Sequence, residues 1–327
     1  MPTVEFIQIE ATTRCNFSCA FCPGRHLKQG DIAYNLFEQI LNEFNDIRYI
    51  QLYGEGEPLI HPSFFRMVKL ASCNNITVST ITNGSLLGTN FSNIITSGLH
   101  SLHVSLESVD SNTFRNIRGG NLSRILESIA LLINIKKSKE SATPFVGLSV
   151  TVLKETMSNL NSIFRQYQDL SLDGGIIIQP LNEMSSYTQN YSDSVHHQVL
   201  NKTDIIRINK ALECNEIFND IQKNKLLKYT YFESLRENFN IEQDGCPWLN
   251  RSLFINFMGF AMPCSMIKDV KQYSFGNIGE DTKQSVLKKR EIMRRKMLEG
   301  DTPEACKNCR TLDSRYKPGI IHQHLDT

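Results

Sequence analysis

Three cysteines near the start of the chain are the first residues whose spacing suggests chemistry. Cys15, Cys19 and Cys22 lie in the segment TTRCNFSCAFCPG. Thiolates bind zinc or cluster iron, but a structural zinc site needs a fourth protein ligand, and His26 is the only histidine nearby. Three cysteines on a 4Fe-4S cluster instead leave one iron open for a substrate or cofactor. We therefore favour a 4Fe-4S cluster over zinc.

Four further cysteines lie toward the end of the chain. Cys246 precedes a Pro-Trp pair, Cys264 follows eighteen residues later, and Cys306 and Cys309 form a CxxC pair. Four cysteines in two groups can close a tetrahedral zinc site or ligate a second 4Fe-4S cluster completely. The spacing alone does not decide between these two metals.

The composition limits the partners and the compartment. The formal net charge of +1 over 327 residues gives no general field for nucleic acid or an anionic membrane. No segment reaches the roughly eighteen apolar residues of a membrane span, and the start has no secretory signal pattern. We therefore predict a cytoplasmic protein with no nucleic-acid and no membrane partner. Because the cytosol keeps thiols reduced, the nine cysteines are expected to ligate metal rather than to form disulfides.

The elements that must position these cysteines alternate between strand and helix patterns. Apolar runs predict six strands, at residues 4–10, 49–54, 76–81, 99–106, 145–153 and 174–180. Helical periodicities between them predict right-handed crossovers and a parallel sheet. Six units indicate an α/β fold, a partial (β/α)6 TIM-like barrel, with an open doubly wound sheet as the alternative. In either fold ligands gather at the carboxyl ends of the strands, where the first three cysteines begin.

The chain divides into three predicted parts. Residues 1–181 form the barrel, and residues 246–327 form a small cysteine-bearing domain. Residues 182–245 are a linker with bridging helices, predicted at 203–225 and 231–239.

The CxxxCxxC spacing, with Phe21 before the last cysteine, resembles the cluster loop of the radical S-adenosylmethionine (SAM) superfamily. This resemblance implies that the open iron chelates the amino and carboxylate groups of SAM. Reductive cleavage then yields a 5′-deoxyadenosyl radical, which abstracts a substrate hydrogen. An external one-electron reductant such as flavodoxin or ferredoxin is implied as a partner.

Other segments match further motifs of this superfamily. Gly56, Glu57 and Pro58 resemble its GGEP motif, whose glycines let the backbone approach the SAM amine, and Glu55 stands where the first glycine is usually found. The family pattern implies SAM-contacting roles for the remaining residues, which lie at or just after the ends of the third, fourth and sixth predicted strands. These are Asn83, Ser105, Glu107, Arg118 and Gln179.

The C-terminal cysteines resemble the SPASM or "twitch" extension of radical SAM enzymes, in the form that carries one auxiliary cluster. The resemblance implies that Cys246, Cys264, Cys306 and Cys309 ligate a second 4Fe-4S cluster, and together with the barrel it covers nearly the whole chain. Of the two remaining cysteines, Cys73 is predicted to be a small buried hydrophobic residue. The other, Cys214, is either an inert helix residue or the donor that returns a hydrogen atom to an inverted carbon.

Three hypotheses for the function remain. Because the barrel begins within ten residues of the start, a separate peptide-recognition domain is not expected there. This favours a small hydroxylated metabolite of sugar or aminocyclitol type, which is oxidised or epimerised, with oxidation preferred. The alternatives are epimerisation or crosslinking of a ribosomally made peptide, and a non-catalytic cluster or zinc-binding module.

Overall fold

The computed structural model describes residues 4–223, 245–307 and 309. Within them lies one sheet of nine strands, in the order β6-β5-β4-β3-β2-β1-β7-β8-β9. Neighbours from β6 to β7 are parallel, and the last two pairings are antiparallel. The first six strands are β1 (Phe6–Ile9), β2 (Tyr49–Leu52), β3 (Thr77–Thr82), β4 (Ser101–Ser105), β5 (Phe145–Val152) and β6 (Ile176–Pro180).

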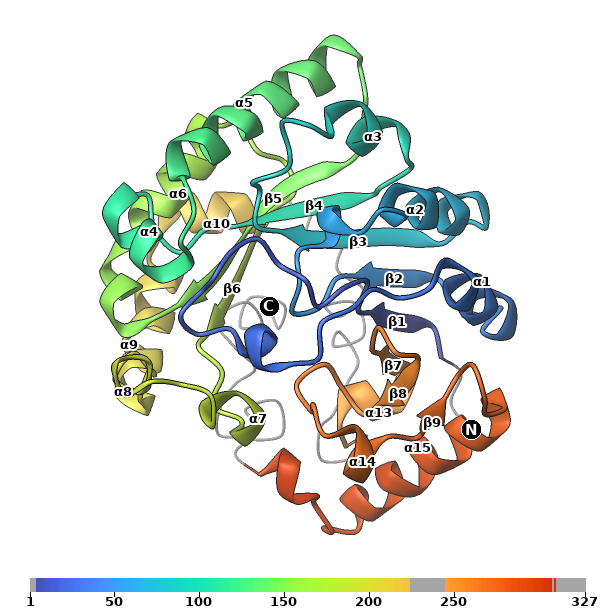
Figure 1. Ribbon diagram of the computed structural model, residues 1–327. Helices are drawn as coiled ribbons and strands as arrows, with labels where there is room; N and C mark the ends of the chain where they lie inside the picture. Colours follow the sequence, from blue (N-terminus) through green and yellow to red (C-terminus); the bar gives the residue numbers. More distant parts are fainter. Residues whose placement is uncertain (1–3, 224–244, 308, 310–327) are drawn as a thin grey trace.

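Helices connect the parallel strands and cover the outer face of the sheet (Figure 1). They are α1 (Tyr34–Glu43), α2 (Phe64–Cys73), α3 (Phe91–Thr96), α4 (Ser111–Arg118), α5 (Leu122–Ser138) and α6 (Leu160–Asp169). The sheet curves but does not close into a barrel, and the predicted α/β partial barrel is confirmed. No helix in the described ranges is long and apolar enough to cross a membrane.

The outer helices form where an apolar stripe meets the sheet. In α2 the buried residues are Phe64, Met67, Val68 and Ala71, which follow helical spacing on one face. Cys73 lies off this stripe and is exposed. The prediction of a buried Cys73 is therefore wrong.

Helix α4 ends at a residue that matters for the site. The Asp110 carboxylate accepts the Thr113 N–H at 2.8 Å and caps its start. Gly119, with φ of 80°, closes its end, and the Gly119 N–H donates to the Arg115 carbonyl at 2.7 Å. This left-handed cap fixes Arg118 as the last helical residue.

The C-terminal segment extends the barrel sheet. After α13 (Pro247–Arg251), strand β7 (Ser252–Ile255) pairs with β1 in parallel, with Phe6 opposite Ser252. The strand thereby covers an edge of β1 that would otherwise expose unpaired backbone groups. In the described residues, the elements that follow are β8 (Phe260–Met262), α14 (Val270–Tyr273), β9 (Gly276–Asn277), α15 (Lys283–Leu298) and the short helix η5 (Glu304–Cys306).

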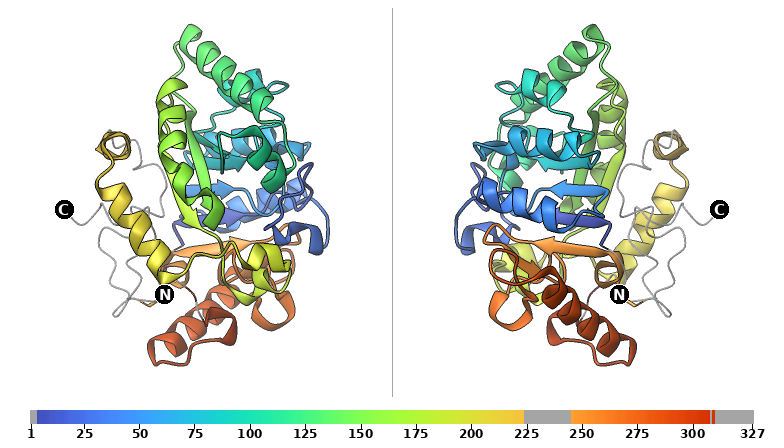
Figure 2. Two further views of the ribbon diagram at one scale, coloured as in Figure 1. Left: turned by 90° about the vertical axis from the view of Figure 1, so that its left-hand side faces the viewer. Right: turned by 90° about the vertical axis from the view of Figure 1, so that its right-hand side faces the viewer.

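Residues 182–223 of the segment predicted as a linker contain the helices α7 (Ser185–Thr188), α8 (Asp193–His196), α9 (Lys202–Glu213) and α10 (Glu216–Lys223). Its buried side chains Tyr187 and Tyr191 pack with Phe21 of the cysteine loop. The helix predicted at 203–225 is divided at Cys214 and Asn215 into α9 and α10. Its last two residues and the whole helix predicted at 231–239 lie outside the described residues. In the side views α9 and α10 lie away from the cysteine loop, on the opposite side of the molecule (Figure 2).

Candidate functional site

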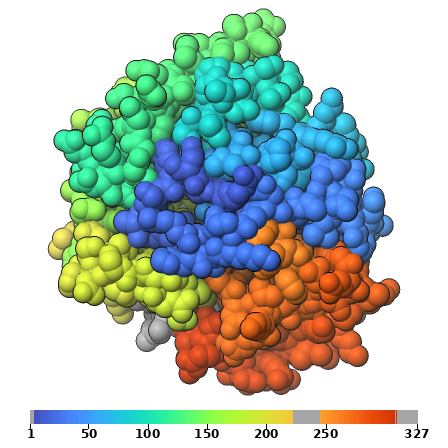
Figure 3. Space-filling model, in the orientation of Figure 1, coloured from blue at the N-terminus to red at the C-terminus, as the bar shows by residue number. Residues whose placement is uncertain are grey.

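The cysteine loop crosses the carboxyl end of the sheet, between β1 and the short helix η1 (Pro23–His26). Its start is fixed because the Thr12 hydroxyl donates to the Asp31 carboxylate at 2.7 Å and the Thr13 N–H donates to the Gly30 carbonyl at 3.0 Å. Figure 3 shows the loop on the molecular face, bordered by the segment that contains α7 and by the C-terminal segment. Three distant parts of the sequence therefore meet around these cysteines.

All three loop cysteines are free thiols, and each sulfur has polar neighbours from the surrounding protein. The Phe17 N–H donates to the Cys15 sulfur at 3.4 Å, and the Gly24 N–H donates to the Cys22 sulfur at 3.3 Å. Burial raises the pKa of each of these thiols. Bound iron would favour the thiolate form that burial disfavours, so this donor set fits the first cluster.

Two residues predicted to contact SAM also lie beside these sulfurs. The Asn83 amide donates to the Cys15 sulfur at 3.8 Å, and an Arg118 nitrogen donates to the Cys19 sulfur at 3.6 Å. The guanidinium opposes the rise that burial causes in the pKa of Cys19. The ends of β3 and α4 therefore deliver polar groups to the same loop.

Arg118 and Glu107 form a buried ion pair. Two nitrogens of the Arg118 guanidinium, Nε and Nη2, donate to the two carboxylate oxygens of Glu107. The distance from Nη2 to Oε1 is 2.5 Å. Glu107 is fully buried, and the Arg118 guanidinium carbon lies 5.7 Å from the centre of the Phe21 ring. Each partner compensates the charge of the other, which would be costly to bury alone.

The three residues that match the GGEP motif pack the turn after β2 against the cysteine loop. A Cβ at Gly56 would lie 2.4 Å from the Thr12 carbonyl oxygen and 2.6 Å from that of Arg14. Buried Pro58 begins helix η2 (Pro58–Ile60). Only glycine at position 56 permits this approach of the two backbones.

The Glu57 carboxylate is engaged by the protein itself. It accepts the Thr82 hydroxyl at 2.7 Å, the Asn83 N–H at 2.6 Å and the Leu59 N–H at 3.1 Å. The residue is 1% exposed, and burial raises its pKa despite these donors. Glu57 thus ties the turn after β2 to the end of β3.

The remaining predicted SAM contacts lie at the carboxyl ends of their strands. Ser105 is the buried last residue of β4 and lies opposite Ser149 in the register. Gln179, in β6, is exposed, and its amide lies 3.5 Å from the Thr151 hydroxyl. Both residues belong to the edge of the sheet on which the cysteine loop lies.

The second cysteine set gathers around one cavity. Burial raises the pKa of Cys264 to about 11 and that of Cys306 to about 12, and it also raises the pKa of Cys246. The Cys309 N–H donates to the Cys306 carbonyl at 3.1 Å. The cavity is lined by all four cysteines together with Met184, Trp248, Leu249, Pro263, Met266, Ile267, Met293 and Met297.

Both cysteine sets have the donor chemistry of an iron–sulfur cluster or of zinc. In the part of the chain that the structure describes, no group of three His, Cys, Asp or Glu side chains is arranged to hold one metal ion. A zinc site would bring each sulfur to about 2.3 Å from one point, whereas a four-iron cluster binds each thiolate through a different iron.

Sequence reasoning missed the surroundings of Glu55. Its carboxylate accepts Lys268 Nζ at 2.6 Å and the Tyr187 hydroxyl, and it lies 3.6 Å from the Cys22 sulfur. The one available signal was a carboxylate at a motif position where glycine is usual. No local pattern singles out Lys268.

Cys214 is separate from this constellation. It is exposed at the end of α9, and the neighbouring Asn215 donates to Asn161 of α6. The structure does not bring it to the residues gathered around the cysteine loop. Its role as a hydrogen donor stays a prediction.

Comparisons with known proteins identify the family. Residues 9–166 match the Radical SAM superfamily, and residues 246–310 match SPASM, an iron-sulfur cluster-binding domain. The chain belongs to the radical SAM superfamily and carries a C-terminal SPASM domain. These domains imply 4Fe-4S clusters and SAM as cofactors.

Among curated relatives, the chain is 25% identical to the tungsten-containing aldehyde ferredoxin oxidoreductase cofactor-modifying protein of Pyrococcus furiosus, over 85% of this chain and 79% of that one. It is 28% identical to the GTP 3′,8-cyclase of Marinobacter nauticus, over 63% and 62% of the two chains.

Two solved structures share the fold. Streptococcus suis SuiB bound to the precursor peptide SuiA has a TM-score of 0.66 at 16% identity, over 88% of this chain and 65% of that one. The protein anSMEcpe with bound AdoMet and Cp18Cys peptide has a TM-score of 0.65 at 17% identity, over 96% and 91%.

Proposed function

We propose that this radical SAM enzyme binds its SAM-cleaving cluster through Cys15, Cys19 and Cys22. In the same proposal Cys246, Cys264, Cys306 and Cys309 hold the auxiliary cluster. A cluster held by these three loop cysteines would, with SAM bound, supply the one-electron reductive cleavage of SAM that leads to abstraction of a substrate hydrogen. An external one-electron reductant completes the system.

The polar residues around the loop have distinct proposed roles. Arg118 places positive charge beside Cys19 and near the expected SAM carboxylate, while Glu107 orients its guanidinium. Asn83 lies against Cys15, and Glu57 holds the Asn83 backbone N–H. Glu57 therefore acts in this proposal as a positioning residue for SAM, because its oxygens are already engaged by protein donors.

For the substrate we propose a peptide. The observation that carries this proposal is the likeness of the fold to two structures that hold peptides, one bound to a precursor peptide and one to the Cp18Cys peptide. These likenesses span 88% and 96% of the chain, which includes both cysteine-bearing parts. The small hydroxylated metabolite preferred from the sequence has no comparable support in these two structures.

Oxidation is the proposed outcome. The four auxiliary cysteines gather around one cavity, whereas Cys214 is exposed at the end of α9. An epimerase of the predicted kind needs a hydrogen-donating thiol near the substrate. The described geometry supports the auxiliary set and gives no such support to Cys214.

The experiment is anaerobic co-expression of the enzyme with each short peptide encoded beside its gene, followed by mass spectrometry of the recovered peptide. Loss of a pair of hydrogens indicates oxidation, and unchanged mass with solvent deuterium at an inverted carbon indicates epimerisation. A variant with Cys15, Cys19 and Cys22 replaced by alanine is the matched control. The peptide proposal fails if no peptide changes while sugars or aminocyclitols stimulate formation of 5′-deoxyadenosine.

A further inference from the structure

A nearly buried ion pair joins the two parts of the chain that carry the cysteine sets. Lys268 Nζ lies 2.6 Å from a Glu55 carboxylate oxygen, and the side chains are 11% and 13% exposed. Glu55 belongs to the turn after β2 in the barrel, whereas Lys268 follows Cys264 by four residues. The pair thus connects positions 213 residues apart in the sequence.

Glu55 is held from several directions beside the first cysteine set. One of its oxygens is 3.6 Å from the Cys22 sulfur, and the other also accepts the Tyr187 hydroxyl. Its backbone N–H donates to the Glu10 carboxylate at 3.3 Å. Glu10, which follows β1, therefore holds the backbone of Glu55, and Tyr187 of α7 holds its carboxylate.

Lys268 is also held by several contacts, in the segment that carries the second cysteine set. Its ammonium lies 5.4 Å from the centre of the Tyr187 ring and 5.8 Å from that of Phe254. The preceding residues Met266 and Ile267 line the cavity of the auxiliary cysteines. The Met266 carbonyl also accepts the Ser186 hydroxyl at 2.5 Å, which anchors the segment to α7.

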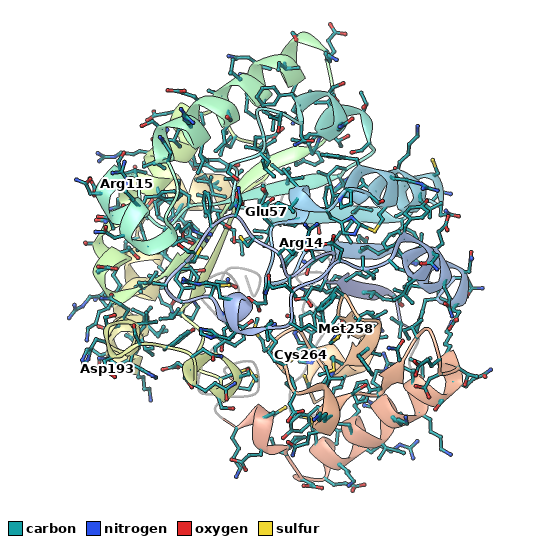
Figure 4. The ribbon with its side chains drawn as sticks, in the orientation of Figure 1. Arg14, Glu57, Arg115, Asp193, Met258 and Cys264 are labelled. Atoms are coloured by element: carbon teal, nitrogen blue, oxygen red, sulfur yellow. The ribbon has the colours of Figure 1, made fainter. Side chains whose placement is uncertain are left out.

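Contacts thus run from the Cys22 sulfur through Glu55 and Lys268 to the segment that begins at Cys264. Figure 4 labels Cys264 on the C-terminal segment. Burial alone would lower the pKa of Lys268, but the carboxylates of Glu55 and Glu10 raise it, so this lysine stays charged. Its positive charge lies where the two parts of the chain that carry the cysteine sets meet.

We propose that Glu55 and Lys268 are positioning residues that fix the two cysteine sets relative to each other, and that the Lys268 charge acts on the clusters at both sets. This inference rests on the proposed function, which puts a cluster at each set. A buried ion pair contributes little net stability compared with apolar packing, so a positional and electrostatic role accounts better for its presence. Nearby charge and hydrogen bonds set the reduction potential of an iron–sulfur cluster.

Removing the charge of Lys268 and removing that of Glu55 should shift the reduction potential of the first cluster in opposite directions. Lys268→Met removes a cation that stabilises an added electron, so the reduction potentials of both clusters become more negative. Glu55→Gln removes an anion beside Cys22, so the potential of the first cluster becomes more positive. Lys268→Arg retains the charge and keeps both potentials near those of the parent. Loss of packing alone would not produce opposite shifts.

The test is a redox titration of the reconstituted full-length enzyme, followed by electron paramagnetic resonance of each cluster. Lys271→Met and Glu280→Gln, both exposed in the same C-terminal segment, are matched controls and leave the potentials unchanged. Unchanged potentials in Lys268→Met, or shifts of the same sign in Lys268→Met and Glu55→Gln, would overturn the proposal. If Lys268→Met changed the reduction potential of the first cluster alone, the claim that the Lys268 charge acts on both clusters would be contradicted.

A second measurement does not depend on bound iron. A double-mutant cycle of Glu55→Gln and Lys268→Met, followed by chemical unfolding of the iron-free protein, measures the coupling of the two side chains. We expect each single variant to be less stable than the parent, and the double variant to lose less than the sum of the two single losses. Additive losses would overturn the positioning role. Failure of the proposed function has a different signature, since it would appear as missing iron or missing SAM cleavage in the parent enzyme.

Discussion

The guanidinium of Arg118 spans both carboxylate oxygens of Glu107 and directs its remaining nitrogen to the sulfur of Cys19. One side chain thereby links the end of α4, the residues after β4 and the cysteine loop. The geometry depends on the planar, forked shape of the guanidinium, which a lysine ammonium does not reproduce.

The first prediction concerns this pair. Arg118→Met leaves the buried Glu107 carboxylate without its cation and should lower the free energy of unfolding by about 3–5 kcal/mol. Arg118→Met combined with Glu107→Leu should recover most of that loss, because no buried charge remains. Urea unfolding of the iron-free, reduced protein measures both. Equal stability of the two variants would show that the charge of Glu107 is not balanced by Arg118.

A second prediction concerns the close approach at Gly56. Gly56→Ala forces a Cβ onto the Thr12 and Arg14 carbonyl oxygens, so we expect a loss of about 1–3 kcal/mol in unfolding free energy and weaker SAM binding. Gly88→Ala is the matched control, because its Cβ would meet only the Ser128 hydroxyl, at 3.6 Å. That control should change stability by less than about 0.5 kcal/mol. Similar losses in the two variants would refute the steric explanation.

The third prediction tests Glu57. Glu57→Ala removes the acceptor of the Thr82 hydroxyl and of the Asn83 N–H, which both lie in buried surroundings. Unpaired buried donors cost about 1–3 kcal/mol each, so the unfolding free energy should fall by at least 2 kcal/mol, as an order of magnitude. SAM affinity should also fall, because Asn83 is released beside Cys15. The iron content should remain that of the parent. Calorimetric titration with SAM measures the loss of affinity, and iron analysis shows whether the cluster is retained.

The fourth prediction is a pH dependence that arises from His103. Burial lowers its pKa to about 4, although the Gly174 carbonyl accepts from its ring nitrogen at 2.8 Å. Below the ordinary pKa of about 6.5 the unfolded chain binds a proton that the folded protein resists, so stability falls as pH decreases from about 6.5 toward 4. The loss from this residue is on the order of 3 kcal/mol. His103→Gln should flatten the stability profile in this window, whereas replacement of the exposed His197 by Gln should not. Parallel profiles for His103→Gln and the parent would contradict this assignment.

Much of the barrel could be predicted because its strands are short apolar runs bounded by polar residues. The run 145–153 corresponds to β5 (Phe145–Val152), and the run 49–54 contains β2 (Tyr49–Leu52). The positions of these strands can be predicted from the local hydrophobic pattern without knowledge of which segments they pack against. Helix α4 was missed, although Asp110 and Gly119 are ordinary start and stop signals on either side of it.

The rest depended on contacts between distant segments. The pairing of β7 with β1 joins residues that are far apart in the sequence, and no local pattern specifies that partner. The Glu55–Lys268 ion pair could not be predicted for the same reason, because the two side chains meet only in the folded protein. Tyr187 was assigned to a linker because its neighbours are polar, yet it is buried beside Glu55.

The central claim is that Cys15, Cys19 and Cys22 hold the cluster that cleaves SAM and that the C-terminal cysteines hold another. The most direct measurement is iron analysis of the anaerobically reconstituted protein, together with detection of 5′-deoxyadenosine after reduction with SAM. The parent should carry about eight irons per chain and form 5′-deoxyadenosine, whereas replacing the three loop cysteines with alanine should leave about four irons and abolish that product. SAM cleavage that persists in the alanine variant, or zinc as the dominant metal at either site, would contradict the account.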